Sequence, residues 1–135
     1  MITIHQGVDL VELSKFKEVL RRNNEFVRDM FTERERAYCE SMKDPTVHFA
    51  GRFAAKESYA KALGTGFSGT GVDHLFQEIE VTSNSSGKPE ISVRGWAAKM
   101  AKKRKIRQSS VSISHTAHYA VASVILVGES RERTG

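Results

Sequence analysis

Two carboxylates occupy positions of this sequence where an acidic side chain is costly to bury. Glu57 lies in the stretch GRFAAKESYAKALGTG, residues 51–66, and a helical projection at about 100° per residue places it in the apolar arc that contains Phe53. Asp9 interrupts the otherwise apolar GVDLV, residues 7–11. Burial of an unpaired charge is unfavourable, so each carboxylate must meet a cation or hydrogen-bond donors, or bind a ligand.

Each carboxylate has an ordinary structural explanation beside a chemical one. Glu57 and Lys61 are spaced i, i+4, which suits a surface ion pair worth about 0.2–0.5 kcal/mol. Asp9 could satisfy backbone donors at the start of a helix. Alternatively, the two carboxylates, which come from separate elements, hold one Mg²⁺. This hard cation takes few protein oxygens and completes its octahedron with water and substrate phosphate. Neither residue alone decides between these explanations.

A glycine-rich turn and one histidine are further candidates. The segment LGTGFSGTG, residues 63–71, predicts a helix C-cap at Gly64. Its amides could also bind an anion, although the segment lacks the P-loop pattern. His115 lies at the predicted end of a strand, where a polar turn residue is the simpler explanation. The five histidines and the lone Cys39 lack zinc spacings, and no GxSxG elbow marks a nucleophilic serine.

Composition limits the class of protein and its partners. The 135 residues, 39% of them apolar, predict one domain with a hydrophobic core. The 21 basic and 16 acidic side chains give a net charge of +5, which favours an anionic partner without identifying it. A single cysteine and an N-terminus without a signal-peptide layout predict a cytoplasmic protein. The longest apolar run, residues 119–127, is far short of the roughly 20 residues that span a membrane, so we expect no membrane segment.

The periodicity of apolar residues predicts the elements that position these side chains. Ile2 and Ile4 indicate a short strand, with Asp9 at the junction to the first helix. Helices are expected over residues 14–22, 32–42 (closed by Pro45), 47–63 and 96–105. Strands are expected over 76–81 and 90–93, joined by SNSSGKP, and a last hairpin should pair 111–114 with 119–127; residues 129–135 should form a loose tail. Helices early and strands late indicate an α+β fold.

Two surfaces are expected to be basic. Lys15, Val19 and Arg22, at i, i+4 and i+7, form a strip on the first helix, away from its apolar stripe. Residues 94–107 contain seven basic side chains and no acid. A solvated outer face explains that run most simply. Because base-stacking aromatics are not interleaved with the charges, we expect no nucleic-acid partner.

Four segments in the same order resemble a known family: GVDLVELSKF, GRFAAKESYAKALGTG, SGKPEISV and SISHTAHYAVASVIL. They resemble the holo-acyl-carrier-protein synthases, the short type of 4′-phosphopantetheinyl transferase, over nearly the whole chain. The resemblance implies an α+β fold with an antiparallel sheet packed with a long central helix, in a homotrimer with the active site between subunits. It also implies transfer of the phosphopantetheine arm of coenzyme A to a serine of apo-acyl carrier protein, which releases adenosine 3′,5′-bisphosphate.

The resemblance assigns roles to individual residues. Asp9 and Glu57 would bind Mg²⁺, and Lys61 would contact the diphosphate or the leaving phosphate; these three form the expected catalytic set. The coenzyme would be held by Arg52, Lys61, the turn of Gly64, Thr65 and Gly66, and His115. Positioning and charge neutralisation suit this reaction. Whether Glu57 or a metal-bound water removes the serine proton is left open.

The acidic carrier protein is the expected partner of the strip formed by Lys15, Val19 and Arg22, with electrostatic attraction that weakens as salt rises. The family often has arginine where this chain has Lys15, a change that keeps the charge but loses the bidentate fork. The alternative from another class is a small basic protein that binds coenzyme A, a nucleotide or RNA without turnover. The physiological acceptor and the use of acylated coenzyme A do not follow from the sequence.

Overall fold

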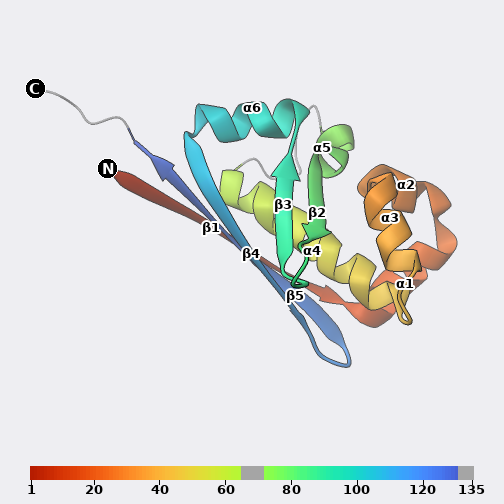
Figure 1. The fold of residues 1–135 in the computed structure, drawn as a ribbon. Coiled ribbons are helices and arrows are strands. Elements are labelled where there is room, and N and C mark those ends of the chain that lie inside the picture. The colour runs from red at the N-terminus through yellow and green to blue at the C-terminus, as the bar shows by residue number, and fades with distance from the viewer. Residues whose placement is uncertain (65–71, 131–135) are drawn as a thin grey trace, which may run out of the picture.

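The computed structural model describes residues 1–64 and 72–130, without the side chains of residues 72–74. Its elements follow in the order β1 (Ile2–Glu12), α1 (Leu13–Arg22), α2 (Asn24–Met30), α3 (Glu33–Glu40), α4 (Pro45–Leu63), α5 (Val72–Glu78), β2 (Ile79–Ser83), β3 (Pro89–Val93), α6 (Gly95–Lys103), β4 (Ile106–His115) and β5 (Tyr119–Glu129). The predicted α+β class is confirmed (Figure 1).

Two antiparallel sheets form the β-structure. The larger has the strand order β1-β5-β4, and the smaller is the β2-β3 hairpin. β1 pairs with β5 along its whole length, from Ile2 opposite Glu129 to Glu12 opposite Tyr119. Figure 1 shows α4 crossing the larger sheet, with α1, α2 and α3 gathered at one end of that helix. The expected arrangement of an antiparallel sheet packed with a long central helix is therefore confirmed.

α4 is buried on nearly all sides, because the larger sheet packs against it on one side and α1 and α3 pack against it elsewhere. Its alanines pack with Val124 and Leu126 of β5 in one apolar cluster, while Phe49 joins Phe16 and Phe31 in a second. The helix begins with Pro45 at its first position, where the missing N–H costs nothing. The expectation that Pro45 only closes the preceding helix was therefore incomplete.

Several predicted boundaries differ from the structure. The first strand runs to Glu12, so Asp9 lies inside β1 rather than at a junction with a helix. Residues 76–78 belong to α5 rather than to a strand. The short helix α2 was not predicted, although Asn23 caps it by accepting a hydrogen bond from Phe26 N at 3.0 Å. Thr32 and Glu35 form a capping box at the start of α3, which agrees with the predicted start of this helix.

Glu129 and Ser130, which the sequence places at the start of a loose tail, pair with the N-terminal end of the chain. Glu129 is the last residue of β5 and lies opposite Ile2, and Ser130 N donates to Met1 O at 2.9 Å. Residues 131–135 lie outside the described part of the chain. None of the described helices has both the length and the apolar character needed to cross a bilayer.

Candidate active site

A close approach between β1 and α4 places the candidate site. A Cβ atom on Gly7 would lie 1.9 Å from the carbonyl oxygen of Ser58, so only glycine fits there without movement. The Ser58 hydroxyl donates to Ala54 O at 2.7 Å and to Ala122 O at 3.0 Å, which ties the helix to β5. Two residues after Gly7 on the same face of β1, Asp9 therefore faces α4.

Asp9, Glu57 and Lys61 come together at this contact. Lys61 Nζ donates to Asp9 Oδ1 at 3.0 Å and to the carbonyl of Val8 at 3.2 Å. Asp9 is only 11% exposed, whereas Lys61 is 47% exposed. The second carboxylate oxygen of Asp9, Oδ2, is buried and has no hydrogen-bond partner. The sequence thus predicted three residues that the fold brings into one cluster.

The environment of Glu57 opposes its ionisation. Burial raises the pKa of Glu57 to about 8, and the neighbouring Asp9 carboxylate adds to the rise. Lys61 acts in the opposite direction. Two carboxylates held this close repel each other unless a proton or a cation lies between them.

The donor set fits a hard divalent cation. Asp9 presents a buried oxygen without a donor, and Glu57 is the adjacent carboxyl group. The described residues contain no group of three or more His, Cys, Asp or Glu side chains placed to hold a metal. A cation at Asp9 and Glu57 would therefore keep several coordination positions for water and ligand oxygens, as Mg²⁺ commonly does.

Arg52 lies on α4 in a different environment. It is 5% exposed, and its guanidinium sits 4.1 Å from the centre of the Tyr38 ring. Nη2 donates to Ser83 Oγ at 3.4 Å, while the buried Nε has no partner. A cavity of about 380 Å³ opens beside it, lined also by Arg34 and the β2-β3 hairpin. This is a cationic recess with an unused donor.

His115 lies near the level of Asp9 in the larger sheet, two strands away from it. It ends β4, two residues beyond Ile113, which shares with Asp9 the partner Ala122 on β5. His48 on α4 feels the charges of both Arg52 and His115, although burial is the main cause of its lowered pKa.

The remaining predicted residues divide by location. Gly64 ends α4 in the left-handed conformation with φ 78°, as its predicted C-cap role requires, whereas Thr65 and Gly66 lie outside the described residues. Lys15 and Arg22 are exposed on α1 and reach Glu12 at 3.6 Å and Glu18 at 3.3 Å. Such surface ion pairs are weak, so both cations stay available to a partner.

Comparisons with known proteins agree with this geometry. A model of the 4′-phosphopantetheinyl transferase superfamily matches residues 6–124. The chain belongs to this superfamily. It is 40% identical to the holo-[acyl-carrier-protein] synthase of Caldanaerobacter subterraneus subsp. tengcongensis over 125 residues, 93% of this chain and 95% of that protein. It is also 40% identical to the synthase of the same description from Geotalea daltonii over 121 residues, 89% of this chain and 94% of that protein.

Solved structures give the same answer. The ACPS–CoA complex of Chronobacterium ammoniagenes superposes with a TM-score of 0.83 and 31% identity, covering 95% of this chain and 99% of that one. A holo-(acyl-carrier-protein) synthase from Bacillus anthracis in complex with CoA (3′,5′-ADP) gives 0.75 and 34%, covering 96% and 100%. The resemblance found in the sequence is confirmed, and the chain is a phosphopantetheinyl transferase.

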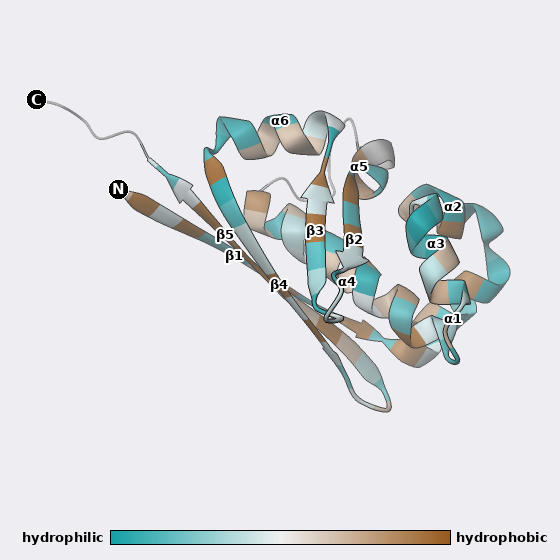
Figure 2. Cartoon of the chain, viewed as in Figure 1, coloured by the Kyte–Doolittle hydropathy of each residue, from teal (hydrophilic) through white to brown (hydrophobic). Residues whose placement is uncertain are grey.

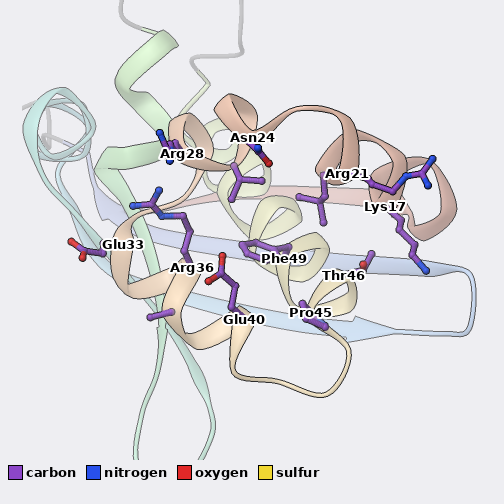
Figure 3. A pocket seen from close by; sticks show the side chains of 13 residues that line it. Lys17, Arg21, Asn24, Arg28, Glu33, Arg36, Glu40, Pro45, Thr46 and Phe49 are labelled. Carbon is purple, nitrogen blue, oxygen red and sulfur yellow. The ribbon is translucent and has the colours of Figure 1, made fainter.

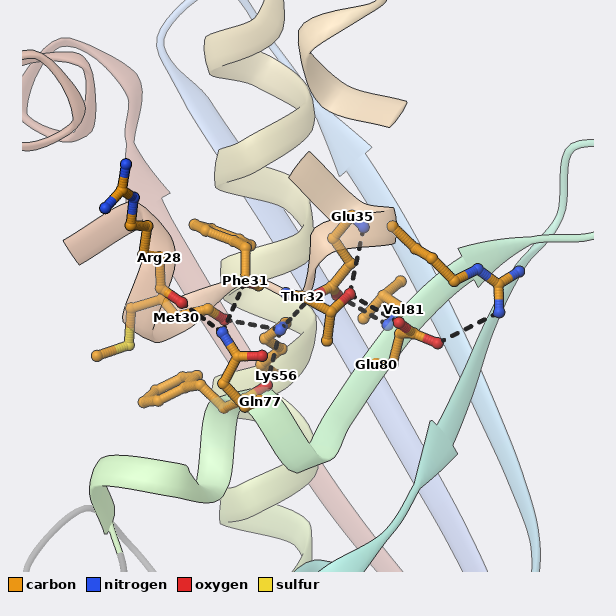
Figure 4. Close-up of polar contacts among 11 residues, drawn as sticks. Arg28, Met30, Phe31, Thr32, Glu35, Lys56, Gln77, Glu80 and Val81 are labelled. Carbon is orange, nitrogen blue, oxygen red and sulfur yellow. Dashed lines mark hydrogen bonds and ion pairs between the residues drawn. The ribbon is translucent and has the colours of Figure 1, made fainter. Parts of the chain in front are cut away.

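One buried charge of this transferase was missed. Lys56 is fully buried, and its Nζ binds the Glu35 carboxylate and donates to Met30 O and Phe76 O, both at 2.7 Å (Figure 4). Glu35 Oε2 in turn accepts from Val81 N at 2.8 Å. The projection that singled out Glu57 also places Lys56 within about 20° of Phe49. That signal was in the sequence, and the more deeply buried charge is the lysine.

The close contact at Gly7 makes a prediction for this transferase. Gly7→Ala would drive a methyl group into the Ser58 carbonyl, so we expect a loss of unfolding free energy of about 1–3 kcal/mol or more. Any folded fraction should have Asp9 displaced from Lys61 and should transfer phosphopantetheine more slowly. Urea unfolding measures the first effect. Lys99→Ala, at an exposed position of α6, should change stability by less than about 0.5 kcal/mol; equal stability of Gly7→Ala and wild type would contradict the contact.

Proposed function

We propose that the chain is a single catalytic domain that transfers 4′-phosphopantetheine from coenzyme A to a serine of apo-acyl carrier protein, with Mg²⁺ bound. The products are holo-acyl carrier protein and adenosine 3′,5′-bisphosphate. Relatives named holo-[acyl-carrier-protein] synthase and a neighbour solved with CoA support the substrates. The observation that carries the proposal is the cluster of Asp9, Glu57 and Lys61, with its unpartnered Asp9 oxygen.

The residues of the cluster suit phosphoryl transfer. Asp9 and Glu57 would hold Mg²⁺, which neutralises charge on the diphosphate oxygens. Lys61 is half-exposed, so its ammonium can reach from Asp9 toward the diphosphate or the leaving phosphate. The carrier serine oxygen attacks the diphosphate phosphorus, and the bond to adenosine 3′,5′-bisphosphate breaks. The ionised carboxylate of Glu57 is one group that could accept the proton of the attacking serine hydroxyl.

The cationic recess is the proposed place for the rest of the coenzyme. Arg52 offers an unpartnered Nε beside a cavity, and the charges of both Arg52 and His115 reach His48 on α4. Gly64 to Gly66 would hold coenzyme phosphates through backbone amides. In this proposal, one part of the coenzyme lies at the metal site of Asp9 and Glu57, and another part lies beside Arg52.

The outward face of the larger sheet supports the proposed homotrimer. Ile2, Ile4, Val8 and Leu10 alternate along β1 with exposures between 57% and 70%, and Ile125 of β5 continues the patch. Figure 2 shows hydrophobic residues recurring along both strands. An apolar patch of this kind on a soluble chain marks an interface.

Leu10→Lys should break this assembly. A charge in the centre of an apolar interface is costly to desolvate, so we expect the variant to run as a monomer in size-exclusion chromatography with light scattering. Val19→Lys adds the same charge at an exposed apolar residue of α1 and should leave the mass unchanged. A monomeric wild-type chain at micromolar concentration would contradict the trimer.

The strip formed by Lys15, Val19 and Arg22 is the proposed docking face for the carrier protein. Reversing both charges, with Lys15→Glu and Arg22→Glu, should raise the KM for the carrier protein about 10-fold or more at low salt and change kcat little. The difference should shrink at high salt, where the charges are screened. Lys102→Glu with Lys103→Glu, on α6, makes the same change in net charge elsewhere. If the KM for the carrier protein did not change at low salt, the carrier protein would dock on a surface other than α1.

Product analysis separates transfer from simple binding. We expect chromatography to detect adenosine 3′,5′-bisphosphate only when coenzyme A, apo-carrier protein and Mg²⁺ are all present, and chelation should stop its formation. A basic protein that binds coenzyme A, nucleotide or RNA without turnover would release none. A panel of apo-carrier proteins in the same assay identifies the preferred acceptor.

A further inference from the structure

A groove of about 690 Å³ lies between α1, α2, α3 and the start of α4 (Figure 3), and neither Asp9 nor Glu57 lines it. Its apolar lining includes Leu20, Val27 and Phe49. This volume falls in the range of roughly 300–1,000 Å³ that is typical of sites for small ligands. The groove involves none of the residues assigned to the coenzyme or to the metal.

Cations line the groove from three helices. Lys17 and Arg21 come from α1, Arg28 from α2 and Arg36 from α3. Arg21 pairs with Glu18 at 3.2 Å, but no acid lies within ion-pair distance of the other three among the described side chains. Figure 3 shows Arg28 and Arg36 together at one end of the groove. Two unpaired guanidiniums at one opening repel each other, and an anion between them would remove that repulsion.

The acids of the groove limit what can bind. Glu33 and Glu40 both come from α3, and neither has an ion-pair partner among the described residues. They would repel a protein segment that carries negative charge along its whole length. A ligand with a single anionic end avoids this repulsion, since its charge stays at Arg28 and Arg36 while its uncharged part follows the apolar lining.

We propose that this groove binds an amphiphilic anion, an alkyl or acyl chain with one phosphate or carboxylate head. The head binds Arg28 and Arg36, and the chain covers the half-buried Leu20 and Val27. Each buried CH₂ contributes about 0.8 kcal/mol, so a short chain on this lining gives measurable affinity. Binding in this groove does not depend on the transfer reaction, so a failure of one would not exclude the other.

Calorimetric titration with dodecyl phosphate and with dodecanoate, below their micelle concentrations, tests the proposal. Arg28→Gln with Arg36→Gln should raise the dissociation constant at least about 10-fold, because both contacts to the anionic head are lost. Lys102→Gln with Lys103→Gln removes the same amount of positive charge from α6 and should leave the dissociation constant unchanged. Glu40→Gln should tighten binding. The tighter of the two probes identifies the preferred head group.

Localisation and neutral probes complete the test. Amide resonances around Leu20, Val27 and Phe49 should shift on titration, while far-ultraviolet circular dichroism stays constant. Dodecanol and inorganic phosphate, which each lack one half of the ligand, should bind at least about 10-fold more weakly. Equal affinity in wild type and the double arginine variant would overturn the proposal. So would equal affinity for dodecanol, or shifts in the groove caused only by acidic carrier protein.

Discussion

Replacing Glu57 with glutamine is expected to abolish phosphopantetheine transfer while the chain stays folded. The change keeps the shape of the side chain but removes the charge that would share a cation with Asp9. Loss of such electrostatic stabilisation costs at least about 100-fold in rate. Stability should not fall, because burial and Asp9 raise the pKa of Glu57 to about 8, so that its ionised form is unfavourable in the metal-free fold.

Initial transfer rates at fixed Mg²⁺, together with thermal unfolding, measure both parts of this expectation. Glu12→Gln is the matched control, because it removes a carboxylate from the end of β1, the strand that carries Asp9, where Glu12 accepts from Ser14 and pairs with exposed Lys15. It should retain activity. An active Glu57→Gln variant at ordinary Mg²⁺ concentration would show that the metal is held elsewhere.

Replacing Lys56 with methionine should produce the largest loss of stability. The variant keeps the length of the side chain but leaves the Glu35 carboxylate buried without a cation, and leaves the carbonyls of Met30 and Phe76 without a donor. Breaking a buried ion pair in this way costs about 3–5 kcal/mol. Removing both charges, with Lys56→Met and Glu35→Leu, should recover part of that loss.

Denaturant unfolding gives the free energy, and the single cysteine gives an independent readout. Cys39 is fully buried, and burial raises the pKa of its thiol to about 12, so labelling at pH 8 should require unfolding. Lys56→Met should label faster than wild type. Lys99→Met, on the exposed side of α6, should behave as wild type. If Lys56→Met stayed within about 0.5 kcal/mol of wild type, the buried pair would not hold these elements together.

Local signals in the sequence predicted much of the fold. The capping box at Thr32 and Glu35 and the glycine at position 64 each set a helix boundary through contacts within a few residues. The N-terminal strand was underestimated because its pairing with β5 extends it to Glu12, and that partner is more than 100 residues away in sequence. Non-local pairing of this kind leaves only a weak local pattern.

The candidate site depended on a tertiary contact. The sequence identified Asp9, Glu57 and Lys61 by residue type and by resemblance, but their proximity depends on β1 meeting α4 at Gly7. A lone glycine in a strand is a weak signal of such close approach. Lys56 was not predicted to be buried, because a lysine on an apolar helix face can usually extend its ammonium to solvent. A buried lysine needs partners from other elements, and no pattern within α4 reveals Glu35 as that partner.

The most direct test of the account is the intact mass of a carrier protein. Apo-acyl carrier protein incubated with the chain, coenzyme A and Mg²⁺ should gain the mass of one phosphopantetheine group on a serine. The gain should be absent after chelation and with Glu57→Gln. A competent acceptor whose mass stays unchanged in the complete mixture, or rises equally with Glu57→Gln, would contradict the assignment of transfer to the cluster of Asp9, Glu57 and Lys61.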